Sequence, residues 1–305
     1  MSKETEKVIK EMKKYIDENI GEDTTDEHME KLLEEFMMMQ NNMPYEEVTE
    51  EMAETADDYL ELAELADSDE EAIRYVKLAL EIEPENLDAM VALAKLTIDN
   101  APDMLAKFQE LIKKGEEIME KEGFMTEECM GEFWGIFETR PFIRLRRKYM
   151  DLLIICGMMK SATKEAEEIL TLNEGDNLGV RYILMSIYSF LEDEDAAMKL
   201  YSKYGEYDET RLLLPLSVLY YKKMDYKKAK YYLNKLAKTN KDTKKFIKGV
   251  VNDDLEKYYD EMDAFGYQPF TIEEFLIDLR ECFFAYTTTG MYFQWAQEAL
   301  KTRKK

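Results

Sequence analysis

The sequence of 305 residues has little of the chemistry on which most enzymes and metal sites depend. It contains one histidine, His28, and three cysteines far apart in the chain, Cys129, Cys156 and Cys282. A single histidine excludes a histidine-rich metal site and a histidine-activated nucleophile. Scattered cysteines in an odd number are typical of reduced, buried thiols in a cytosolic protein. We therefore predict no catalytic residue, no metal ligand and no cofactor.

Glycine, proline and long apolar runs are also scarce. The chain has 12 Gly and 6 Pro, which favours helices over turn-rich β structure. Its longest apolar runs, 152–159 and 212–221, are too short to span a bilayer, and the absence of an apolar stretch after Met1 excludes an ordinary signal peptide. Phosphate-binding, dinucleotide-binding and serine-hydrolase motifs do not occur. We expect a cytoplasmic, non-enzymatic, all-α protein, while an enzyme with an unrecognised carboxylate pair stays open.

Basic residues are few relative to acidic ones, and the imbalance is local. The chain has 41 Lys and Arg against 66 Asp and Glu, a net charge of −25. Residues 1–120 hold 35 acidic and 12 basic residues, a net charge of −23, and the rest of the chain is nearly neutral. A strongly acidic surface repels nucleic acid and anionic membranes. The acidity therefore argues against such partners mainly for the first part of the chain.

The first 50 residues have the pattern of two amphipathic helices. Val8, Met12, Ile16 and Ile20 recur at about one helical turn, and Gly21 follows as a stop signal. A second helix is predicted after a capping box formed by Thr24 and Glu27. The apolar face of this second helix consists of Met29, Leu32, Leu33, Phe36 and Met37. We predict an acidic, helical N-terminal segment over 1–50.

A period of about 34 residues follows. Ala162, Ala196 and Ala229 take equivalent small positions, 34 and 33 residues apart, in units over 143–176, 177–210 and 210–243. Such spacing is typical of helical hairpins stacked in a solenoid. We predict degenerate helix pairs over 51–122, a connector with three repeats over 123–245, and a C-terminal helical cap over 246–305. The cap is expected to contain a capping box at Thr271 and Glu274.

Several motifs resemble those of a known family. Ala72, Ala79 and Pro84 resemble the second helix of a tetratricopeptide repeat (TPR). The Phe-Trp pair at 133–134, Glu-Thr-Arg-Pro at 138–141 and Asp-Asn-x-Gly-x-Arg-Tyr at 176–182 are similar to a group of bacterial cytosolic TPR proteins. The resemblance implies a TPR-like right-handed superhelix of antiparallel helix pairs, with the N-terminal extension and the C-terminal cap. It implies a scaffold and no particular reaction.

The connector and the turn near 175 carry local predictions. Thr139 is expected to cap the helix that Pro141 helps to start, and Glu138 to pair with Arg140 or Arg144. Gly175 is expected to supply a positive φ in the turn over 173–176.

The TPR resemblance implies that the first helix of each hairpin lines a concave groove. The predicted partner-binding residues on that basis are Arg140, Arg144, Arg147, Arg181, Tyr188, Arg211, Tyr221 and Lys222. Arginine offers a planar fork for bidentate contact with carboxylates. We predict binding of an acidic segment or C-terminal carboxylate of a partner protein. The alternative is that these arginines form internal salt bridges.

A second surface is predicted over 220–248. Eleven lysines lie in 222–248, interleaved with tyrosines, whereas 50–71 holds eleven acidic residues and no basic one. Lysines among aromatic residues bind single-stranded nucleic acid in some proteins, so a regulatory or nucleic-acid-associated role is the alternative function. A solvated helix face is the simpler interpretation. The acidic stretch could also approach the lysines of another copy, which would give salt-sensitive self-association.

Overall fold

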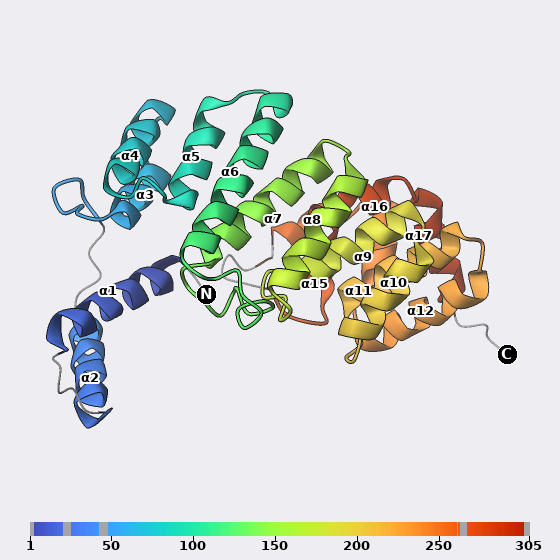
Figure 1. Cartoon of the computed structure of the whole chain (residues 1–305). Helices are drawn as coiled ribbons and strands as arrows, with labels where there is room; N and C mark the ends of the chain where they lie inside the picture. Colours follow the sequence, from blue (N-terminus) through green and yellow to red (C-terminus); the bar gives the residue numbers. More distant parts are fainter. Residues whose placement is uncertain (1–2, 21–25, 43–47, 261, 263–266, 302–305) are drawn as a thin grey trace. The chain divides into compact units, whose positions relative to one another are not determined.

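The computed structural model describes residues 3–20, 26–42, 48–260, 262 and 267–301. These residues form seventeen α-helices and no β-strand, which confirms the all-α prediction (Figure 1). The chain divides into two compact units. The first comprises 1–125 and 135–145, and the second comprises 126–134 and 146–305. None of the described helices is long and apolar enough to cross a membrane.

The first unit begins with six helices. They are α1 (Lys3–Asn19), α2 (Asp26–Asn42), α3 (Ala56–Leu65), α4 (Asp69–Ile82), α5 (Leu87–Thr97) and α6 (Ala101–Lys121). Each of α3, α4 and α5 contacts the helix that follows it (Figure 1). Helix α7 (Arg140–Ile155) contributes its start to the first unit and the rest to the second.

Side-chain caps set where these helices begin. Ser68, Asn86 and Asn100 each accept a hydrogen bond from the backbone N–H three residues on. This satisfies one of the donors that a helix start leaves without a partner. Gly123, at φ +79°, follows the end of α6. The predicted stop at Gly21 and the capping box at Thr24 lie outside the described residues.

Small residues let the helices of the first unit approach closely. Ala56, Val76, Ala79 and Ala89 are buried together where α3, α4 and α5 meet. On α6, Gly115 leaves room for the ring of Phe142, which is fully buried. On α2, Leu32 and Phe36 are buried, whereas Met37, predicted on the apolar face, is 53% exposed.

The second unit holds the remaining helices. They are α8 (Met159–Leu172), α9 (Val180–Leu191), α10 (Glu194–Tyr204), α11 (Thr210–Lys222), α12 (Tyr226–Thr239), α13 (Thr243–Asn252), α14 (Glu256–Tyr259), α15 (Ile272–Glu281), α16 (Phe283–Thr287) and α17 (Gly290–Ala299). Helix α11 contacts α9, α10, α12 and α15, so all its residues from Thr210 to Tyr220 are buried.

Two details of the repeats differ from the sequence prediction. The fully buried alanine of α10 is Ala197, whereas Ala196 is half-buried. In the turn over 173–176 the positive φ belongs to Asp176, at 47°, and not to Gly175. The Asp176 carboxylate accepts hydrogen bonds from the N–H groups of Val180 and Arg181, which compensates the left-handed conformation.

The predicted capping box at the start of α15 differs in its partners. Thr271 does begin α15, but its hydroxyl accepts from Glu273 N–H, while the Glu274 carboxylate accepts from Phe270 N–H. The hydroxyl of Thr139 donates to the Ile136 carbonyl.

Candidate functional site

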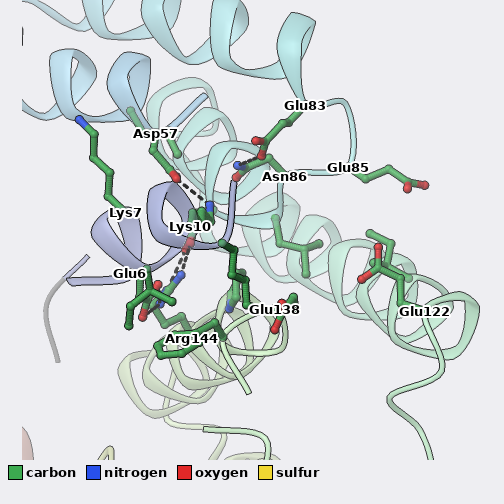
Figure 2. Close-up of a pocket in the computed structure, with 18 of the residues that line it drawn as sticks. Glu6, Lys7, Lys10, Asp57, Glu83, Glu85, Asn86, Glu122, Glu138 and Arg144 are labelled. Carbon is green, nitrogen blue, oxygen red and sulfur yellow. Dashed lines mark hydrogen bonds and ion pairs between the residues drawn. The ribbon is translucent and has the colours of Figure 1, made fainter. Parts of the chain in front are cut away.

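The first unit contains a pocket of about 520 Å³. Helix α1 forms one wall, and α3, the α4–α5 turn, the end of α6 and the start of α7 form the others (Figure 2). Its floor is apolar and its rim is charged. The buried apolar residues in its lining are Leu60, Leu87, Ile118 and Met119.

Two arginines from the start of α7 lie at one end of the pocket region. The Arg144 guanidinium contacts the Glu6 carboxylate at 2.8 Å and also pairs with Asp88. Arg140, which is 3% exposed, pairs with the same Glu6 at 3.4 Å and lies over the ring of Phe137. Burial lowers the pKa of Arg144, but Asp88 and Glu6 outweigh it and hold that pKa above its ordinary value. Glu6 and Asp88 thus favour the charged form of Arg144.

Three lysines of α1 lie at intervals of three residues along the pocket. Lys7 pairs with Asp58 at 2.6 Å and Glu61 at 3.3 Å. Lys10 pairs with Asp57 at 2.6 Å (Figure 2). One turn further along, Lys13 pairs with Glu138, which lies just before α7. The predicted pairing of Glu138 with Arg140 or Arg144 is therefore replaced by a pairing with α1.

The local fold of α3 places one of these carboxylates. Thr55 and Asp58 form a capping box, in which each accepts a hydrogen bond from the backbone N–H of the other. The box fixes Asp58 at the start of α3, where its other oxygen meets Lys7. Burial raises the pKa of Asp58, but the hydrogen bonds from Lys7 and Thr55 outweigh it, and the pKa lies below its ordinary value.

The α4–α5 turn and the end of α6 complete the acidic rim. Glu83, Glu85 and Glu122 line the pocket there, beside the capping residue Asn86 (Figure 2). Within the described residues, no three His, Cys, Asp or Glu side chains are grouped so that they could hold a metal ion. The groups present suit non-covalent recognition of charge, because Arg144, lysines and carboxylates line the pocket together.

The other predicted arginines lie in the second unit and contact acidic groups or carbonyls of their own chain. Arg147 pairs with Asp151 at 3.1 Å and donates to the Leu178 carbonyl at 2.8 Å. Arg181 pairs with Asp176 at 2.9 Å and with Glu209 at 3.2 Å. These contacts correspond to the internal salt bridges that the sequence left as the alternative.

Arg211 contacts an acidic segment, but that segment belongs to the same unit. Its guanidinium pairs with Asp278 at 3.3 Å and with Glu281, both on α15. Helix α15 lies against α11, and α16 lies against α9. A predicted groove arginine thus contacts an acidic helix, and this helix belongs to the same chain.

The three remaining predicted residues also have contacts within the second unit. Tyr188 donates to Glu167 at 2.6 Å. Lys222 donates to the carbonyls of Ser189 and Phe190, at 3.0 and 2.6 Å. Tyr221 packs in a ring cluster with Tyr226, Tyr292 and Trp295.

Sequence reasoning missed the α1 side of the pocket. Glu6, Lys7, Lys10 and Lys13 were not predicted as site residues. A signal was present, because these lysines recur every three residues in an otherwise acidic segment. Neither a scan of protein-family models nor a search of curated proteins finds a match to this chain.

Proposed function

We propose that this chain is a non-enzymatic, cytoplasmic scaffold that binds a helical segment of another protein in the pocket of the first unit. The observation that supports this most directly is the seating of α1, a helix held on the pocket by charged side chains. The surface can therefore receive a helix. The TPR-like right-handed superhelix implied by the sequence resemblance is part of this proposal, because such arrays bind peptides along one face.

The proposed chemistry of recognition has two parts. Arg140 and Arg144 bind a single carboxylate of the partner, as Glu6 does, so of the acidic partner expected from the sequence only this one contact is retained. The acidic rim binds basic side chains further along the same helix. Arginine forks supply orientation as well as affinity at the carboxylate end.

A panel of fluorescent helical peptides tests this proposal by anisotropy. Peptides with one glutamate followed by lysines are expected to bind wild type and to bind Arg144→Gln at least tenfold more weakly. Arg280→Gln, an exposed arginine of the second unit, is the matched control and should bind as wild type does. Equal binding to all three proteins would contradict the proposed site.

The exposed side chains of α12 favour a second candidate function. Tyr226 and Tyr231 are 50% and 58% exposed, beside the exposed Lys227 and Lys230. Exposed aromatic rings among lysines suit an anionic partner such as single-stranded RNA. A gel-shift assay with wild type and Lys227→Glu/Lys230→Glu tests this alternative: a wild-type shift lost in the variant supports it, and no shift at low salt removes it.

A further inference from the structure

Helix α1 is held on the first unit by charge more than by apolar burial. Among its described side chains, from Glu6 onward, only Glu6 is buried, and the apolar Val8, Ile9 and Met12 are half-buried. The lysines that meet the rim are themselves partly exposed: Lys10 and Lys13 keep about half of their side-chain surface in solvent. Ion pairs at such exposure are individually weak and are screened by salt.

From this we propose that α1 is a resident and displaceable ligand of the pocket, and that the partner is a cationic helix with the same charge pattern. This proposal rests on the proposed function of the site. The pattern is a glutamate for Arg140 and Arg144, followed by basic residues one, four and seven positions later, as in Glu6, Lys7, Lys10 and Lys13.

Charge complementarity determines this occupant. With α1 in place, hydrogen bonds from Lys7 and Lys13 help to hold the pKa values of Asp58 and Glu138 below their ordinary values, against the effect of burial. When α1 leaves, these carboxylates, Asp57 and Glu61 lose their basic partners while their own positions on α3 and before α7 are kept. A surface left with an excess of carboxylates attracts a cationic helix and repels an acidic one.

The remaining volume gives a partner its advantage over α1. Ile9 is the apolar residue that α1 contributes to the pocket, which still holds about 520 Å³ of space over its apolar floor. A larger apolar side chain at the Ile9 position would remove more of its own surface from water in this space. Burial of apolar surface strengthens binding in proportion to the area removed from water. A partner helix with an aromatic residue there is therefore expected to displace α1.

Hydrogen exchange of the full chain tests the resident helix without any partner. In the variant Lys7→Glu/Lys10→Glu/Lys13→Glu, the amides of α1 are expected to exchange at least tenfold faster than in wild type. The matched control is Lys14→Glu/Lys77→Glu/Lys95→Glu, which makes the same charge change at exposed sites of the first unit outside the pocket. Wild type should show the same acceleration between 0.05 M and 1 M NaCl. If the exchange rate of the α1 amides changes neither with salt nor in the Lys7→Glu/Lys10→Glu/Lys13→Glu variant, the proposal is overturned.

Peptide binding then tests the competition. A labelled peptide of residues 3–19, and the same peptide with Ile9→Phe, are added to the three proteins. The first variant is expected to bind the peptide at least tenfold more tightly than wild type or the control, and the Ile9→Phe peptide more tightly still. Equal binding by all three proteins overturns the resident helix and leaves the proposed function standing. Faster exchange of α1 with no peptide binding by any protein overturns the proposed function and the cationic partner.

Discussion

The Glu6 carboxylate accepts two hydrogen bonds from Arg144, at 2.8 and 2.9 Å, across 138 residues of sequence. This contact joins α1 to the start of α7 inside the first unit, and Arg140 shares the same carboxylate. A single acidic side chain thus carries much of the attachment of α1.

Neutralising that carboxylate is predicted to loosen α1. Glu6→Gln keeps the shape of the side chain and removes its charge, and hydrogen bonds to charged groups contribute about 1.5 kcal/mol or more. We expect the free energy of local opening of α1, measured by hydrogen exchange, to fall by about 1.5 kcal/mol. Glu18→Gln, an exposed glutamate of the same helix, is the control. An equal effect of both substitutions would contradict this assignment.

Arg211 and Asp278 form a buried ion pair in the second unit. Asp278 is fully buried, and burial raises its pKa above the ordinary value although Arg211 opposes the shift. Removing Arg211 leaves the buried Asp278 without its ionic partner, which typically costs about 3 to 5 kcal/mol, whereas removing Asp278 leaves Arg211 still paired with Glu281. We expect Arg211→Met to lower the free energy of unfolding by about 3 kcal/mol, and Asp278→Leu to lower it by less.

A double-mutant cycle separates the pair from its surroundings. The double mutant Arg211→Met/Asp278→Leu removes both charges of the pair together. Its decrease in the free energy of unfolding, measured by urea denaturation, should therefore be clearly smaller than the sum of the decreases in the two single mutants. Strictly additive losses would show that the two side chains act independently.

Gly115 on α6 lies where a β-carbon would collide with a buried ring. A methyl group there would come within 2.5 Å of Cδ2 of Phe142, whose side chain has no exposed surface. Alanine normally stabilises a helix by about 1 kcal/mol relative to glycine, but overpacking a core costs about 1 to 3 kcal/mol. We expect Gly115→Ala to destabilise the first unit by about 1 to 2 kcal/mol in thermal or urea denaturation.

A smaller side chain at position 142 offers a control for this prediction. Phe142→Leu removes the atoms nearest to the new methyl group, so Gly115→Ala should be less harmful in a Phe142→Leu background than in wild type. If the two substitutions add independently, the close approach of α6 and the ring does not determine stability here.

The helices could be predicted from the sequence because their signals are local. Ser68, Asn86 and Pro102 mark starts within one turn of where α4, α5 and α6 begin. Within the turn over 173–176 a left-handed conformation was predicted for Gly175 from the preference of glycine for positive φ. The structure gives that conformation to Asp176, because a carboxylate that accepts two backbone hydrogen bonds compensates the strain.

The candidate site could be predicted only in part, because its contacts are long-range. The arginines were recognisable from their clustering over 140–211, but a repeat pattern does not show which acidic residues they meet. Glu6 contacts Arg144 although the two lie far apart in the sequence, and Asp278, which contacts Arg211, comes from the predicted C-terminal cap. The acidic partners of these arginines depend on how the terminal helices pack, and the periodicity of the sequence does not encode that packing.

Glu194 at the start of α10 makes the stability of the second unit depend on pH. Its carboxylate accepts a hydrogen bond from Lys228 at 2.9 Å and pairs with Lys223 at 3.0 Å. The hydrogen bonds from these two lysines lower the pKa of Glu194 to about 2, against a small opposing effect of burial. Because the folded pKa lies below the ordinary value of 4.5, the stabilisation is present above pH 4.5 and is lost as the pH falls toward 2.

We therefore expect Glu194→Gln to be less stable than wild type at pH 7 and nearly equal to it at pH 2. The pair is largely exposed and screened by solvent, so the difference at pH 7 should be about 0.5 kcal/mol, and it should shrink in 1 M NaCl. Urea denaturation at several pH values measures it, with Glu206→Gln, an exposed glutamate of the same unit, as the control. A difference that stays constant from pH 7 to pH 2 would show that the carboxylate charge does not contribute.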